Sequence, residues 1–219
     1  MGTLCEALKI DIRKHRLIAF VGAGGKTTLI YELARELRSM GYSVAVTTTT
    51  HMGEKGRYGF VPIGVPCGQG KIKGSSPLAP KKLLAEYDVV LTEADGSRRL
   101  PFKVPDVHEP VLPEGVHLVV GIAGASAVGG TFAEKCCRYP VACKHFSCEP
   151  SEKIELRHLV EALDAPWGQK KGVVCDYRRV IGQGEFLDEK QREYFKNLEL
   201  YFETFCHKGL DGQQQKDML

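Results

Sequence analysis

The chain has 219 residues and a formal net charge of +3, with 43% hydrophobic and 26% charged residues. This composition lies in the globular range and excludes the disordered, collagenous and coiled-coil classes. The net charge is too small, and the basic residues are too evenly mixed with acidic ones, for a nucleic-acid-binding surface.

The N-terminal segment does not resemble a secretory signal. Residues 1–16 alternate apolar and charged positions and lack the apolar segment of a secretory signal. No run approaches the roughly 18 apolar residues that a membrane span requires. We therefore expect a cytoplasmic protein without a membrane partner. In that reducing compartment its eight cysteines are expected to be free thiols, metal ligands or redox sites rather than disulfides.

The first fifty residues predict a strand, a loop, a helix and a second strand. Residues 17–21 are a short apolar run ended by glycines, which is typical of a buried parallel strand. Residues 27–40 place apolar side chains at helical spacing, and Gly41 ends that pattern. Residues 42–48 predict the next strand, so this part of the chain forms a βαβ unit with parallel strands.

The rest of the chain predicts further alternation of strands and helices. Residues 53–80 are rich in Gly, Pro, Ser and Lys and predict loops with at most short strands. We expect helices over residues 80–87, 152–163 and 188–205, strands over 88–92 and 116–122, and one strand or a pair over 172–181, whereas 121–147 has no clear assignment.

Together these elements predict an α/β fold in which helices flank a mostly parallel sheet, a three-layer sandwich like that of P-loop NTPases. We expect a single domain over residues 1–219. Its part from 135 to 219 is the least well defined, and a helical C-terminal extension there stays open.

A glycine-rich segment after the first strand predicts a phosphate-binding loop. It lies between an apolar strand and the start of a helix, and glycines allow backbone N–H groups to approach an anion closely. We assign to nucleotide binding the residues Gly22, Ala23, Gly24, Gly25, Lys26, Thr27 and Thr28. Lys26 is expected to contact the terminal phosphates from outside the core, and the Thr27 hydroxyl to bind Mg²⁺.

This loop is shorter than the usual P-loop. Phe20 stands where the first glycine of the motif G-x-x-x-x-G-K-T would fall, which leaves the short form G-x-x-G-K-T. Mur-type peptide ligases and folylpolyglutamate synthases carry a similar short loop. A small ATP-dependent ligase or kinase is therefore an alternative, and a non-catalytic carrier switched by nucleotide is another.

Polar side chains follow two further predicted strands. Glu93 and Asp95 come directly after the strand at 88–92, where a nucleotide site needs an acid to hold Mg²⁺ or to position a nucleophile. We assign Asp95 to the metal shell and Glu93 to a water-orienting role, an assignment that could be exchanged. With Lys26 these acids are the candidate catalytic residues. The candidate substrate contacts Thr49, Thr50 and His51 follow the strand at 42–48, at the carboxyl edge where open α/β sheets bind ligands.

Four segments resemble a known family: residues 20–29, 46–51, 92–103 and 108–113. They are similar to the selenium-dependent hydroxylase accessory proteins of the YqeC type, with a good match over residues 15–122. This resemblance implies a bacterial or archaeal P-loop protein that acts as a nucleotide hydrolase or transferase, with Mg²⁺ and ATP or GTP. Its implied role is to assist the maturation of selenium-dependent molybdenum hydroxylases, so that such an enzyme or its cofactor would be the partner.

The same resemblance implies site roles for Arg98, Lys103, His108 and Glu109. Arg98 and Lys103 suit an anionic second substrate. The segment 182–185 departs from the Asn-Gln-x-Asp-like pattern of the family, which leaves the choice between ATP and GTP open.

Four cysteines cluster in the sequence around His145. They are Cys136, Cys137, Cys143 and Cys148. Thiolates can bind zinc or carry a chalcogen, but these spacings match no zinc-ribbon pattern. The sequence therefore favours free cysteines over a metal site.

Overall fold

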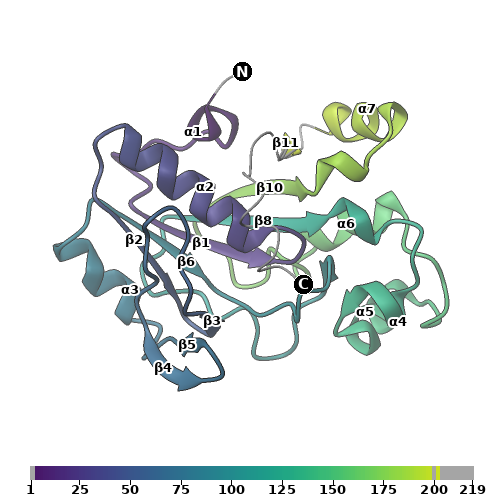
Figure 1. Ribbon diagram of the computed structural model, residues 1–219. Coiled ribbons are helices and arrows are strands. Elements are labelled where there is room, and N and C mark those ends of the chain that lie inside the picture. Colours follow the sequence, from purple (N-terminus) through teal and green to yellow (C-terminus); the bar gives the residue numbers. More distant parts are fainter. Residues whose placement is uncertain (1–2, 199–200, 203–219) are drawn as a thin grey trace, which may run out of the picture.

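The computed structural model describes residues 3–198 and 201–202 (Figure 1). Its centre is a parallel sheet of five main strands: β1 (Leu17–Gly22), β2 (Val44–Thr48), β6 (Val89–Glu93), β8 (Leu118–Gly124) and β10 (Asp176–Gly182). Their order is β10-β8-β1-β6-β2, and the short β11 (Tyr201–Phe202) pairs in parallel with β10 at one edge. The predicted α/β fold is confirmed.

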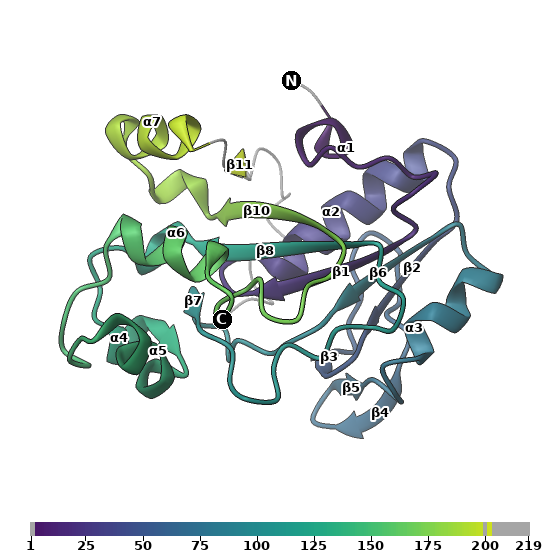
Figure 2. The same ribbon diagram turned by 180° about the vertical axis from the view of Figure 1, so that it is seen from behind.

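Helices cover both faces of this sheet. Ile18 and Phe20 of β1 pack into a core with α2 (Lys26–Ser39) and α1 (Leu4–Ala7), whereas Ala19 and Val21 belong to a separate core. This separation follows from the alternation of side chains along a strand. The short α3 (Ala79–Lys82) contacts β6 and α6 (Leu156–Asp164) contacts β8 from the face opposite α2 (Figures 1 and 2).

Smaller elements surround the sheet. An antiparallel sheet has the order β3-β5-β4 and consists of β3 (His51–Gly53), β4 (Val65–Gly68) and β5 (Lys71–Lys73). A parallel pair joins β7 (Phe102–Lys103) to β9 (Cys136–Cys137). The other helices are α4 (Phe132–Lys135), α5 (Tyr139–Phe146) and α7 (Glu189–Asn197), with 3₁₀ turns at Leu83–Ala85, Ala125–Ala127 and Gly184–Phe186. None of the helices in the described ranges has the length and hydropathy needed to cross a bilayer.

The last predicted helix differs from expectation. The helix predicted over 188–205 ends at Asn197, and residues 201–202 form β11 instead. Closely spaced aromatic residues fit helical spacing, but they are also common in strands, so the pattern did not mark this boundary. The end of that predicted helix, including Phe205, lies outside the described residues. Further upstream, the strand expected within residues 172–181 is confirmed: β10 pairs with β8 in the central sheet.

The strand order places two predicted site segments side by side. All main strands run in the same direction, so their carboxyl ends lie at one edge of the sheet. Because β6 lies between β1 and β2, the turn that carries Glu93 and Asp95 emerges next to the glycine loop that follows β1.

Candidate nucleotide site

The loop between β1 and α2 is closely packed and depends on glycine. Gly22, Gly24 and Gly25 have φ angles of 97°, 83° and 120°, in the left-handed region that favours glycine. A β-carbon on Gly24 would lie 2.2 Å from the Cα of Gly124. Helix α2 begins at Lys26, so the positive end of its dipole lies at the loop. The backbone is thus suited to hold an anion.

An open cavity of about 840 Å³ lies over this loop. Its other walls come from the β3–β5–β4 sheet, from the segment that follows β6, and from β9. The volume falls within the range of about 300–1,000 Å³ that is usual for small-molecule sites. The cavity is therefore large enough for a ligand that extends beyond the loop.

The predicted site residues divide into two groups around this cavity. Those that line it are Gly24, Gly25, Lys26, Thr27, Thr28, Thr50, His51, Glu93, Arg98 and Glu109. Those that do not are Gly22, Ala23, Thr49, Asp95, Lys103 and His108. Thr49 donates a hydrogen bond of 2.6 Å from its hydroxyl to the carbonyl of Val111, and His108 is exposed.

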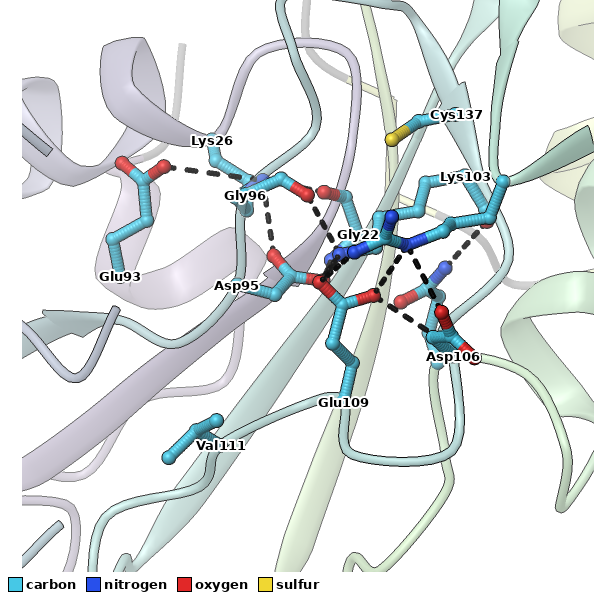
Figure 3. Close-up of polar contacts among 12 residues, drawn as sticks. Gly22, Lys26, Glu93, Asp95, Gly96, Lys103, Asp106, Glu109, Val111 and Cys137 are labelled. Atoms are coloured by element: carbon cyan, nitrogen blue, oxygen red, sulfur yellow. Dashed lines mark hydrogen bonds and ion pairs between the residues drawn. The ribbon is translucent and has the colours of Figure 1, made fainter. Parts of the chain in front are cut away.

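Lys26 is buried within the site, with a relative exposure of 3%. Its Nζ lies 3.1 Å from Oδ1 of Asp95 and 4.0 Å from Oε1 of Glu93, and it donates a hydrogen bond to the Gly22 carbonyl (Figure 3). Burial by itself lowers the pKa of Lys26, but the two carboxylates outweigh that effect and raise the pKa above its usual value. The expectation that Lys26 stands outside the core is wrong, because the fold gives its charge buried partners.

Glu93 shares the cavity wall with Thr27. The Thr27 hydroxyl donates a hydrogen bond of 2.9 Å to Oε2 of Glu93. Burial raises the pKa of Glu93, and the nearby Lys26 and the Thr27 hydrogen bond only partly offset that effect. A hydroxyl and a carboxylate are the kind of oxygen donors that suit Mg²⁺. Of the two acids after β6, Glu93 therefore has the better geometry for a metal role.

Asp95 is fully buried and has a different environment. Its Oδ2 accepts a hydrogen bond of 2.9 Å from the Gly22 backbone N–H and lies 3.2 Å from Nζ of Lys103. Its Oδ1 has an ion-pair contact with Lys26 but accepts no hydrogen bond in the described structure. Asp95 thus joins the glycine loop to two lysines and does not face the cavity.

Ion pairs continue from Asp95 across the site. Nζ of Lys103 lies 3.0 Å from Oε1 of Glu109 and donates a hydrogen bond of 2.6 Å to the Gly96 carbonyl. Nε of Arg138 lies 3.4 Å from Oε2 of Glu109. Burial raises the pKa of Glu109, but Lys103 and Arg138 outweigh it and the pKa falls below its usual range. We call this series the charge chain: Lys26, Asp95, Lys103, Glu109 and Arg138. Its first three members are buried, whereas Glu109 and Arg138 are partly exposed.

Lys103 therefore has an internal role in this structure. The residue is 1% exposed, its ammonium contacts two carboxylates, and its backbone carbonyl accepts a hydrogen bond of 2.7 Å from the buried Gln169. This differs from the expectation that it contacts an anionic substrate.

The clustered cysteines separate into two locations. Cys137 lines the cavity, whereas Cys136 is buried in a hydrophobic core against which the partly buried Cys143 and Cys148 pack. Burial raises the pKa of Cys137, although the positive charge of Lys103 lowers it in part. Within residues 3–198 and 201–202, no three His, Cys, Asp or Glu side chains are arranged to hold a metal ion.

Sequence reasoning missed several residues that line the cavity. Arg99, Arg138 and Gln183 belong to this group. No local motif marks Arg138 and Gln183, because the β7–β9 pair and the end of β10 bring them to the cavity from distant parts of the chain. The left-handed φ of Arg138, 69°, is visible only in the structure.

Comparisons with known proteins agree with the sequence resemblance. A family model described as YqeC protein matches residues 18–63 and 53–140, which include the glycine loop and the charge chain. The uncharacterized protein YqeC of Escherichia coli (strain K12) is 34% identical over 202 residues, which cover 80% of this chain and 79% of that relative. No solved structure matches the chain.

Proposed function

The chain belongs to the YqeC family, and from that premise we propose that it binds ATP or GTP with Mg²⁺ at the loop between β1 and α2. The observation that carries the proposal is the arrangement of Lys26, Thr27 and Glu93 along one wall of the cavity, at the start of α2. A lysine, a hydroxyl and a carboxylate at the N-terminus of a helix are the groups that a magnesium nucleotide requires.

Each of these groups has a distinct task in the proposal. Backbone N–H groups of the loop and the dipole of α2 attract the phosphates, and Lys26 neutralises part of their charge. Thr27 and Glu93 are the residues that would hold Mg²⁺, which supplies charge stabilisation at the phosphate oxygens. Asp95 acts through Lys26, whose position it fixes by their contact of 3.1 Å.

We further propose that the bound nucleotide is turned over by hydrolysis or by transfer to a second substrate. The extent of the cavity supports this, because it continues from the loop to Arg138 and Gln183. The family resemblance supports a place in the maturation of a selenium-dependent molybdenum hydroxylase. A ligase or kinase would release ADP only when its substrate is present, whereas a nucleotide-switched carrier would bind nucleotide without turnover.

Replacement of Lys26 tests the nucleotide site. Lys26→Ala is expected to weaken magnesium-nucleotide binding by about 10- to 100-fold, the effect of losing a charge-assisted hydrogen bond worth about 1.5–3 kcal/mol. Calorimetric titration with ATP and with GTP measures this. Lys82→Ala, at an exposed lysine of α3, is the matched control and should bind as the wild type does.

Circular dichroism must first establish that the Lys26→Ala variant is folded, because loss of the Lys26 ammonium group leaves the buried Asp95 carboxylate with fewer partners. A folded Lys26→Ala protein with unchanged affinity for both nucleotides would contradict the proposal. The maturation role has its own readout: in a strain that lacks this gene, hydroxylase activity should return with the wild-type gene but not with the Lys26→Ala gene.

A further inference from the structure

Two neighbouring arginines on the cavity wall lack acidic partners within the described part of the chain. Arg98 and Arg99 are exposed and line the cavity beside the glycine loop. No carboxylate of residues 3–198 or 201–202 lies within the ion-pair limit of 4.0 Å from either guanidinium. Their charge is thus available to a ligand.

The segment that carries these arginines has an unusual backbone. Arg98 and Arg99 have φ angles of 52° and 62°, a left-handed conformation that is unfavourable for residues with a β-carbon and is often found at functional sites. Three hydrogen bonds hold this segment: Leu100 N to Ser97 O at 2.9 Å, Lys103 Nζ to Gly96 O at 2.6 Å, and Gly124 N to Pro101 O at 2.8 Å. The arginines therefore extend from an anchored turn.

Most other cations nearby are already paired; the exception is the exposed Lys71 of β5, which lines another wall of the cavity and has no ion pair within the described residues. Lys26 contacts Asp95 and Glu93, Lys103 contacts Asp95 and Glu109, and Arg138 contacts Glu109 and Asp106. A second anion would have to compete with these carboxylates for those charges. Arg98 and Arg99 have no carboxylate partner to compete with in the described part of the chain. An anion that binds beside the segment after β6 would therefore contact these two arginines more readily than Lys26, Lys103 or Arg138.

We infer that Arg98 and Arg99 form a second subsite, which binds a small molecule bearing a phosphate or carboxylate group beside the nucleotide. A guanidinium group matches the planar oxygens of these anions with two parallel hydrogen bonds, and two adjacent arginines suit a doubly charged group. This inference extends the proposed function by giving the chemical class of the second substrate. It rests on that function for the identity of the neighbouring ligand, the nucleotide.

Anion titration of the nucleotide-loaded protein tests this subsite. The wild type is saturated with Mg²⁺ and a non-hydrolysable ATP or GTP analogue, which occupies the terminal-phosphate position, and is then titrated with inorganic phosphate or malonate. Arg98→Gln/Arg99→Gln is expected to weaken anion binding by about tenfold or more, as loss of charge-assisted hydrogen bonds predicts. Its affinity for the nucleotide analogue should stay within about twofold.

A charge-matched control separates a local site from a general loss of positive charge. Arg13→Gln/Arg157→Gln removes two exposed arginines that lie away from the cavity, and it should bind anions as the wild type does. Binding of phosphate without malonate would assign a phosphorylated ligand, and the reverse would assign a carboxylate.

Three results would overturn the subsite: no binding of either anion to the loaded wild type, equal binding in all variants, or loss of nucleotide affinity in the Arg98/Arg99 variant. The last result would assign the arginines to the nucleotide itself. If the wild type does not bind the analogue, the nucleotide proposal fails separately. The same titrations in a Lys26→Ala background, without nucleotide, then decide the arginine site.

Discussion

Glu93 and Asp95 are two residues apart, but substitution should affect them in different ways. Asp95→Asn removes the charge between Lys26 and Lys103 and is expected to destabilise the fold by about 3–5 kcal/mol, as for a broken buried ion pair. Glu93→Gln should cost less than about 1 kcal/mol, because burial already disfavours the Glu93 carboxylate. Urea unfolding at pH 8 measures both values.

The pH dependence of the Glu93 variant gives a second check on this assignment. A carboxyl group whose pKa is raised in the folded state contributes stability below its unfolded pKa, and this contribution is lost as the pH rises through the folded value. The wild type should therefore lose stability relative to Glu93→Gln as the pH rises above about 4.3, the ordinary pKa of glutamate. Equal stability losses for Asp95→Asn and Glu93→Gln at pH 8 would contradict the different roles given to these acids.

Residues that are contiguous in the sequence were the part of the site open to prediction. The glycine loop, Lys26 and Thr27 form one continuous segment. Its residue spacing predicts phosphate binding, and the apolar strand before it supports that prediction. Arg138 gave no such signal, because its place depends on the pairing of β9 with residues more than thirty positions earlier. The burial of Lys26 was equally hidden, since its partners come from another strand.

At the scale of elements, α6 contains a histidine whose protonation should affect stability. His158 is buried, its ring lies near those of Phe132 and Phe146, with centroid distances of 5.1 and 4.8 Å, and its Nδ1 accepts a hydrogen bond from the Glu155 backbone N–H. Burial lowers the pKa of His158, and the charge of Arg157 lowers it further.

Acidification should therefore weaken the packing of α6. A histidine with a lowered folded-state pKa contributes stability above its unfolded pKa, about 6.5, and that stability is lost as the pH falls. His158→Asn keeps a hydrogen-bond acceptor near the position of Nδ1 but cannot titrate. Thermal unfolding at pH 7.5 and 5.5 should show a smaller loss of stability in the variant than in the wild type. An identical pH response would place the acid sensitivity elsewhere.

The elements themselves were predictable where hydrophobic pattern and end signals agreed. β1, α2 and β6 combine apolar runs or helical spacing with glycine or acidic residues at their ends, and the structure confirms all three. By contrast, α7 is shorter than predicted, because aromatic residues suit a helix face and a strand equally well. The pairing of β7 with β9 involves two residues from each strand, too few to produce a pattern.

For the whole molecule, the sheet order explains why distant segments form one cavity. β1 lies between β6 and β8, so the loop after it contacts the segments that follow both neighbours. Gly24, Gly124 and Gly182 show how close this approach is: a β-carbon on Gly182 would lie 1.9 Å from the Gly24 carbonyl oxygen. The alternation of strands and helices predicted an α/β fold with a mostly parallel sheet. No pattern in the sequence, however, indicated which strands lie next to each other in that sheet.

This arrangement leads to a prediction about the metal. The connected ion pairs contain three cations, Lys26, Lys103 and Arg138, and four anions, Glu93, Asp95, Asp106 and Glu109. ATP or GTP should therefore bind at least about tenfold more weakly in EDTA than in excess Mg²⁺. Calorimetry under the two conditions measures this ratio, and equal affinities would show that the protein alone neutralises the phosphates.

The excess of carboxylates over cations in these ion pairs also affects which form of nucleotide the loop binds. A site with a surplus of lysines accepts any polyphosphate, and its occupancy follows nucleotide concentration alone. Here the connected ion pairs hold one carboxylate more than cations, which gives them a net charge of −1 when all the groups are ionised. Arg98 and Arg99 lie outside these pairs, at the second subsite, so at the loop itself occupancy should follow the concentration of the magnesium complex, and free nucleotide and inorganic polyphosphate, which lack the divalent counter-ion, should compete poorly there.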